Sequence, residues 1–389
     1  MVNIFLFLSV LFLLTFLFGR LMEKIKMPWV FSALILGSFL AFYNPFSSIT
    51  SSSTFVFLAN LGMYFLLFMI GLEIDLKELK SQSKFIVSST FFIIFFEMVF
   101  GSLIVHFVFG YNWVISLIVA LSFATVGEAI LIPILDEFKI VNTKLGQMII
   151  GIGTLDDIIE VVALIMAVVL IGSSIHSNVN IGMILFSLLI LSILAMGLTK
   201  LKREGEKFKF LNIETLFLFT LSILFLFLGV GDYADSAPLA ALLAGICLKT
   251  FIPMERLKLI ESEIKTMTYG FFAPIFFLWA GSVMDMQYLF TYPLLILLVV
   301  LVSKGAKLLG TYIVAHKKIG VKKSILLGLG LSVRFSTSII IIKILFDSGL
   351  ITAGLYSVII ASSIIFNLII PLVFSHLLVR WNIIKSKKV

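Results

Sequence analysis

The sequence predicts an all-α membrane protein that crosses the bilayer about thirteen times. Its composition is 61% hydrophobic and only 13% charged, whereas an average soluble protein is about a quarter charged. Its apolar runs are about as long as the roughly 20 residues that a helix needs to span a bilayer. Its net charge of +8 lies in short loops between these runs, so we expect a lipid environment and no nucleic-acid partner.

The apolar runs fill the chain and leave no room for a separate soluble domain. The predicted spans are 3–19, 27–43, 54–72, 85–109, 112–135, 145–172, 178–199, 211–230, 233–252, 267–284, 288–316, 323–346 and 353–379. The longest polar connections are 200–210 and 253–266. The first run has no basic segment before it and no small-residue cleavage site, so we interpret it as a span and not as a signal peptide. The single cysteine, Cys247, excludes an internal disulfide.

The basic residues follow the odd-numbered spans. Loops after these spans hold nearly all of the 29 Lys and Arg residues, whereas the opposite loops hold only acidic charges. The positive-inside rule therefore predicts an external N-terminus and a cytoplasmic C-terminus. The exceptions lie within spans: Lys304, Lys307, Arg334 and Lys343. Lys343 is near a span end, from which its side chain can snorkel to the interface, whereas the other three require anionic partners.

The two halves of the chain resemble one another weakly. Span 3 ends with Gly71 and span 10 with Gly281, while span 2 contains Gly37 and span 9 contains Gly245. Because spans 1–6 start outside and spans 8–13 start inside, the second half is predicted to be an inverted repeat of the first. Such repeats place the substrate near the midplane, at helices interrupted in corresponding positions.

Spans 5 and 12 are the predicted interrupted helices. Span 5 carries Thr125, Gly127 and Glu128, and span 12 carries Gly328, Gly330 and Arg334. Polar and glycine residues at this depth favour unwound backbone, which is tolerated only where it is buried in protein or lines a cavity.

Span 6 contains the strongest functional signal, the adjacent pair Asp156-Asp157 followed by Glu160. A charge at mid-membrane costs at least about 2.5–3.5 kcal/mol, so such residues usually line a pathway or pair with each other. Asp156 and Glu160 share a helix face, whereas Asp157 points about 100° away. The alternative for the aspartates is a structural hydrogen-bonding pair. Glu160 is either a third pathway acid or a packing partner.

These groups suit the exchange of a monovalent cation for a proton. Carboxylates with partial access to water bind hard cations or protons, and the two compete for one oxygen site. Lys304 and Lys307 on span 11 are the candidate counter-charges for the acids of span 6. Glu97 on span 4 has either a structural or a functional role. The sequence has no zinc pattern, phosphate loop or nucleophile–base pair, so we expect no enzyme activity, no cofactor and no metal other than the transported cation.

Several motifs resemble the bacterial monovalent cation:proton antiporters of the NapA, Kef and NhaA kind. They are Gly19-Arg20 before Met27-Pro28, the stretch from Leu67 to Asp75, Pro133 to Glu137, Asn142 to Gly146, Ala273-Pro274 through Gly281, and Lys307 to Gly310. The resemblance implies an NhaA-like fold of two bundles in one membrane domain over 1–389. It implies a dimer scaffold at about 1–80 and 211–286, a linker helix at 178–199, and a core bundle at about 85–172 and 288–379.

The resemblance also assigns roles. An Asp-Asp pair marks the sodium/proton exchangers thought to be electrogenic. Asp157 matches the cation and proton site, and Asp156 matches the aspartate that pairs with a lysine. Lys307 is the better match for that lysine, with Lys304 second, and Thr125 falls in the unwound crossing segment. We therefore expect a homodimeric sodium or lithium/proton antiporter in a bacterial inner membrane.

One departure from the family pattern concerns span 12. Relatives often have Arg-Gly-Glu there, whereas this chain has Arg334-Phe335-Ser336, and Glu128 appears on span 5. We predict that Glu128 replaces the missing acid and pairs with Arg334. The alternative is that Glu128 faces the ion cavity.

Three other functions remain as alternatives. The first is a Kef-type potassium/proton antiporter, which is disfavoured because we expect no cytosolic regulatory domain. The second is an intramembrane aspartyl protease, which is disfavoured because adjacent aspartates diverge on a helix. The third is a sensor that does not transport ions.

Overall fold

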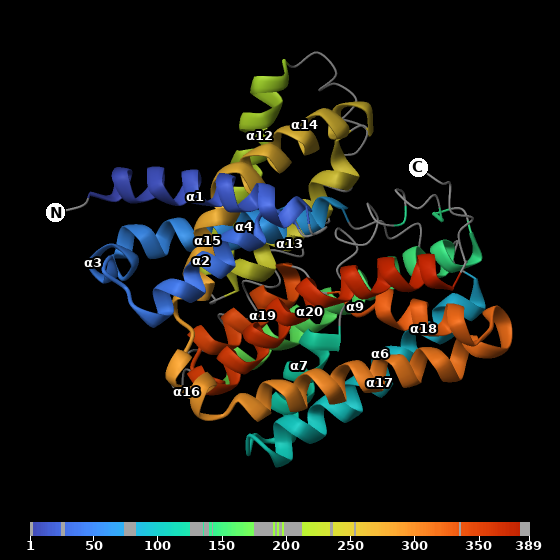
Figure 1. The fold of residues 1–389 in the computed structure, drawn as a ribbon. Coiled ribbons are helices and arrows are strands. Elements are labelled where there is room, and N and C mark those ends of the chain that lie inside the picture. The colour runs from blue at the N-terminus through green and yellow to red at the C-terminus, as the bar shows by residue number, and fades with distance from the viewer. Residues whose placement is uncertain are drawn as a thin grey trace. The chain divides into compact units, whose positions relative to one another are not determined.

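A computed structural model describes residues 3–24, 28–73, 83–124, 135, 140, 141, 143–174, 190, 193, 197, 212–233, 236–252, 254–333 and 336–381. Every regular element among these residues is a helix, as predicted (Figure 1). In chain order they are α1 (Ile4–Lys24), α2 (Phe31–Phe42), α3 (Ser47–Thr50), α4 (Ser53–Glu73), α6 (Lys84–Phe107), α7 (Trp113–Ala124), α9 (Lys144–Ser174), α12 (Ile213–Asp232), α13 (Ala237–Phe251), α14 (Met254–Met267), the π-helix η2 (Thr268–Phe272), α15 (Ala273–Ser282), α16 (Met286–Thr291), α17 (Pro293–Ile319), α18 (Val321–Gly330), α19 (Ser336–Asp347) and α20 (Ala353–Arg380).

Six of the described helices are long and apolar enough to cross a membrane, namely α1, α4, α6, α12, α17 and α20. Shorter apolar helices include α2 and α13. The chain forms two compact units. One contains 1–12, 44–74 and 164–279, and the other contains 13–43, 75–163 and 280–389. The division into scaffold, linker and core bundles stays a prediction, and most of the predicted span 178–199 lies outside the described residues.

The first unit is organised around close packing of α4 against α13. A Cβ atom at Gly71 would meet the carbonyl oxygen of Leu242 and lie 3.1 Å from the Cα atom of Gly245. Only glycine permits two backbones to approach this closely. Lys249, in the last turn of α13, donates a hydrogen bond to the carbonyl oxygen of Glu73 at 2.8 Å and so caps the end of α4.

The predicted polar connection 253–266 is a helix. α14 begins at Met254 and is followed without a break by η2 and α15. Its buried residues are Leu257, Ile260 and Ile264, which recur at the spacing of one helix face. The charged residues between them are good helix formers, so this segment extends the predicted span 267–284 at its N-terminal end.

In the second unit, α2 and α15 repeat the glycine contact of the first. A Cβ atom at Gly281 would meet the carbonyl oxygen of Leu34 and lie 3.0 Å from the carbonyl carbon of Gly37. The four glycines that the sequence relates therefore pack in two pairs, Gly71 with Gly245 and Gly281 with Gly37. Each pair joins a span of one predicted repeat to a span of the other.

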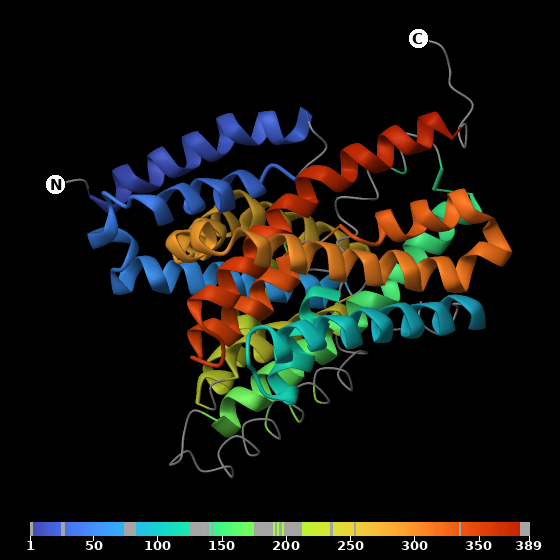
Figure 2. The same ribbon diagram turned by 60° about the horizontal axis from the view of Figure 1, so that its bottom comes forward.

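Helix α17 is the centre of the second unit and packs against α6, α18 and α20. Figure 2 shows α6 and α17 running alongside each other, as they do in Figure 1. A Cβ atom added at Gly310 of α17 would lie 3.5 Å from the Cα atom of Ile93 on α6. A Cβ atom at Gly328 of α18 would meet the hydroxyl of Thr311 on α17. These small residues bring α17 close to both neighbours.

One predicted span is interrupted near its middle. The predicted span 323–346 consists of α18, which ends at Gly330, and α19, which begins at Ser336. Within the predicted span 112–135, α7 covers Trp113–Ala124, and 125–134 lie outside the described residues, so an interruption there stays a prediction.

Candidate functional site

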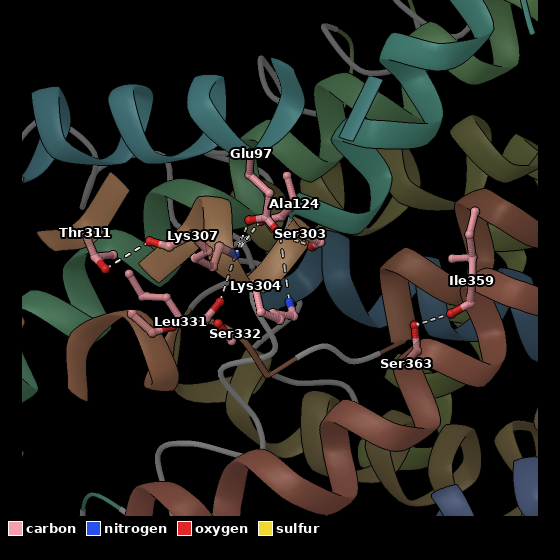
Figure 3. A network of polar contacts seen from close by, with 11 residues as sticks. Glu97, Ala124, Ser303, Lys304, Lys307, Thr311, Leu331, Ser332, Ile359 and Ser363 are labelled. Carbon is pink, nitrogen blue, oxygen red and sulfur yellow. Dashed lines mark hydrogen bonds and ion pairs between the residues drawn. The ribbon is translucent and has the colours of Figure 1, made fainter. Parts of the chain in front are cut away.

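The ammonium group of Lys307 lies between two backbone carbonyls and a carboxylate (Figure 3). Its Nζ atom donates hydrogen bonds to the carbonyl oxygens of Ala124 (2.5 Å) and Leu331 (2.8 Å). It lies 3.0 Å from the Oε2 atom of Glu97 on α6. Both charged side chains are buried, and both come from helices in the second unit.

One of the two carbonyl groups belongs to a helix C-terminus, since Leu331 is the C-cap residue of α18. The last carbonyls of a helix have no partner within it and carry partial negative charge. The other carbonyl belongs to Ala124 on α7. Both hydrogen bonds are buried, so the Lys307 ammonium joins α7 to the end of α18 away from bulk water.

Glu97 is shared by two lysines and a serine. Ser303 donates a hydrogen bond to its Oε1 atom at 2.6 Å. The Nζ atom of Lys304 lies 3.8 Å from the same oxygen and 4.3 Å from the ring centroid of Phe366 on α20. Ammonium groups interact favourably with aromatic faces at this distance. The cluster therefore combines one buried carboxylate with two ammonium groups, so it carries a formal charge of +1 when all three are ionised.

The acidic helix α9 starts at a threonine cap. The hydroxyl of Thr143 accepts a hydrogen bond from the backbone N–H of Gly146 at 3.2 Å and donates one to the carbonyl of Ile140 at 2.7 Å. Side-chain oxygens at this position satisfy N–H groups that have no partner within the helix. Gly146 itself lies so close to the carbonyl of Ile140 that a Cβ atom would clash. These contacts fix the start of the helix that carries Asp156.

Some predicted site residues are placed and others are not. Asp156 lies on α9 and is fully buried. Asp157 and Glu160 lie on the same helix, but their side chains are outside the described residues. Thr125, Glu128 and Arg334 also lie outside the described residues. The pairing of Asp156 with a lysine and that of Glu128 with Arg334 stay predictions.

Glu97 is the main addition of the structure to the predicted site. The sequence marks it as an acid within an apolar span, but nothing local indicates a partner, because Lys304 and Lys307 lie on a helix distant in the chain. Ser303 was not predicted at all, since a serine in an apolar helix usually bonds to its own backbone.

Lys343 has an anionic partner within the protein. Its side chain is fully buried and forms an ion pair with Asp347, four residues later on α19. A partner one helical turn away satisfies the ammonium within the protein, so it need not reach the membrane surface.

The comparisons with known proteins identify the family. The sequence model of the family "Sodium/hydrogen exchanger, transmembrane" matches residues 10–380. The chain belongs to this family. A similar relative is the "Probable Na(+)/H(+) antiporter 3" of Methanocaldococcus jannaschii, 28% identical over 96% of both chains. The "Na(+)/H(+) antiporter" of Enterococcus hirae is 28% identical over 82% of this chain and 83% of its own length.

A solved structure has the same fold as this family member. The sodium proton antiporter MjNhaP1 from Methanocaldococcus jannaschii, determined at pH 8, aligns with a TM-score of 0.63 over 96% of this chain and 95% of its own. The sequence identity of 20% shows the fold alone. The predicted resemblance to cation:proton antiporters is thus confirmed, as is the prediction of a polytopic membrane transporter that is not an enzyme.

Proposed function

We propose that the chain exchanges sodium or lithium ions for protons across the membrane by alternating access, and that the exchange is electrogenic. Sodium/proton exchange follows from the family match over residues 10–380, which is the observation that carries the proposal. The names of the similar antiporters agree with it. Electrogenicity is inferred from the Asp156-Asp157 pair, which resembles the sequence of the exchangers thought to be electrogenic.

In the proposed cycle, the Asp157 carboxylate binds either a proton or the cation. One oxygen site that accepts both ligands, but not together, couples their movements. Asp156 acts as the counter-charge of a lysine, for which Lys307 is the better match to the family and Lys304 the second. Thr125 contributes an oxygen ligand in the crossing segment that the family resemblance predicts to be unwound, and Glu160 is a further pathway acid.

Alternating access requires two bundles that move relative to one another. We propose thirteen spans in two inverted repeats, with the scaffold, linker and core assigned as in the sequence analysis and two broken helices crossing as in NhaA. The reciprocal glycine pairs support the repeat, since Gly71 meets Gly245 and Gly281 meets Gly37. The break between α18 and α19 supports an interrupted helix in the second repeat.

We further propose a homodimer in a bacterial inner membrane, with the N-terminus outside and the C-terminus in the cytoplasm. The placement of basic residues after odd-numbered spans supports this orientation. The dimer rests on the family resemblance. Cysteine-accessibility labelling of single-cysteine variants at the two ends, in a Cys247→Ala background, tests the orientation.

The test of function is proton flux in proteoliposomes challenged with sodium, lithium and potassium in turn. The proposal predicts that sodium and lithium drive protons out of acid-loaded vesicles, whereas potassium does so weakly. Exchange with potassium alone would favour the Kef-type alternative. The absence of flux with all three cations would favour a sensor that does not transport ions.

A further inference from the structure

The Glu97 carboxylate is held in a fixed orientation at the centre of the second unit. Its Oε1 atom accepts a hydrogen bond from Ser303 at 2.6 Å, and its Oε2 atom lies 3.0 Å from the Nζ atom of Lys307. The glutamate and Lys307 are fully buried. A serine bond to one oxygen directs the other toward the ammonium, so the carboxylate has little freedom to rotate.

The position of Lys307 depends on this carboxylate. The carbonyl oxygens of Ala124 and Leu331 provide two partial negative charges to the Lys307 ammonium, and the Glu97 carboxylate, 3.0 Å away, provides a full negative charge. Hydrogen bonds to charged groups are stronger than those between neutral groups. In the proposed cycle Lys307 is also the counter-charge of Asp156 on α9, so the loss of Glu97 would shift the attraction of its ammonium toward the α9 carboxylates.

We propose that Glu97 is a positioning residue for ion exchange, which holds the Lys307 ammonium at the carbonyls of Ala124 and Leu331 and so limits its competition with the transported cation. The inference rests on the proposed function, in which the carboxylates of α9 bind that cation. An ammonium group and a sodium ion carry the same charge and use the same carboxylate oxygens. A lysine released from Glu97 therefore acts as a tethered competitor of sodium.

The experiment measures sodium-driven proton flux in proteoliposomes as a function of sodium concentration, for the full chain and three variants. Glu97→Gln removes the charge but preserves the shape of the side chain. Ser303→Ala leaves every charge in place and removes only the hydrogen bond that orients Glu97. Ser102→Ala is the matched control, because Ser102 is a buried serine on α6 that donates to the carbonyl of Val99 on its own helix.

A positioning role predicts a specific change in the apparent KM for sodium. Glu97→Gln should raise it about tenfold, the factor expected for loss of a charged partner. Ser303→Ala should raise it about threefold, because the ion pair remains and only the hydrogen bond that orients the carboxylate is lost, while the maximal rate per folded protein stays within about twofold. Ser102→Ala should leave the KM unchanged. A change in KM without an equal loss of rate distinguishes competition from misfolding.

Two results would overturn the inference. The first is an unchanged or lowered KM in both Glu97→Gln and Ser303→Ala, which would make Glu97 a structural counter-ion only. The second is an unchanged KM in Ser303→Ala when Glu97→Gln does not fold. If the unmodified chain shows no sodium-driven flux at all, the proposed function itself fails, a result that is recognised before any variant is compared.

Discussion

Glu97 and Lys307 form a buried ion pair of 3.0 Å between α6 and α17. Both partners are removed from solvent, so each depends on the other for compensation of its charge. Breaking a buried pair by removing one partner typically costs about 3–5 kcal/mol, whereas replacing both partners is often much less damaging. The pair therefore contributes both to the stability of the protein and to the position of the Lys307 ammonium in the site.

The first prediction is a double-mutant cycle on this pair. Glu97→Gln and Lys307→Met should each lower the free energy of unfolding by about 3 kcal/mol or more, because each leaves a buried charge without its main partner. The double variant should lose less than the sum of the two, by about 1–3 kcal/mol. The measurement is unfolding of the detergent-solubilised protein by heat or denaturant. Additive losses would show that the two groups are not energetically coupled.

The second prediction concerns the paired glycines. Gly71→Ala and Gly281→Ala should each lower stability by about 2 kcal/mol or more, because the added methyl group would overlap a backbone carbonyl of the facing helix. Gly229→Ala is the control, since a Cβ atom at this α12 position meets nothing within 4 Å. Thermal unfolding of the three variants tests the packing. Equal stability of all three would contradict the close approach of these helices.

Much of this fold follows from the sequence because hydrophobic length and loop charge constrain it strongly. The described helices α4, α6, α12 and α20 agree closely with the predicted spans. The glycines of 323–346 indicated an interrupted helix, and the structure has α18 ending at Gly330 and α19 beginning at Ser336. The charges of 253–266 indicated a polar connection. The buried residues Leu257, Ile260 and Ile264, which recur at helical spacing, show that the segment is helical.

The site was only partly predictable. The acids of α9 and the lysines of α17 are conspicuous because charges are rare at this depth. The partner of Glu97 could not be deduced, since α6 and α17 are far apart in the chain and come together only in the folded protein, where Gly310 lies close to α6. The roles of Ala124 and Leu331 were also hidden, because they act through backbone carbonyls and not through their side chains.

The third prediction concerns Glu128 and Arg334, whose side chains lie outside the described residues. If they pair, Glu128→Gln and Arg334→Gln should each destabilise the protein by about 3 kcal/mol or more, and the double variant should be less damaged than their sum. Glu128→Ser combined with Ser336→Glu should restore much of the lost stability by moving the acid to the usual family position. Additive losses without rescue would favour Glu128 facing the ion cavity.

The fourth prediction is that exchange responds to membrane potential. Each net charge moved across 100 mV changes the free energy by about 2.3 kcal/mol. An electrogenic cycle should therefore run faster or slower when potassium gradients and valinomycin clamp the vesicle potential at different values. The same sodium and proton gradients are imposed in every case. Identical rates at all potentials would contradict the inference drawn from the Asp156-Asp157 pair.

The most direct test of the central assignment is sodium-driven proton flux by the Asp157→Asn variant in proteoliposomes. An amide at this position cannot alternate between a proton and a cation as a carboxylate does. We predict that exchange is abolished while the variant elutes as a folded protein with near-normal thermal stability. Near-normal sodium-driven proton flux in this variant would contradict the assignment of Asp157 as the group that couples the two ions.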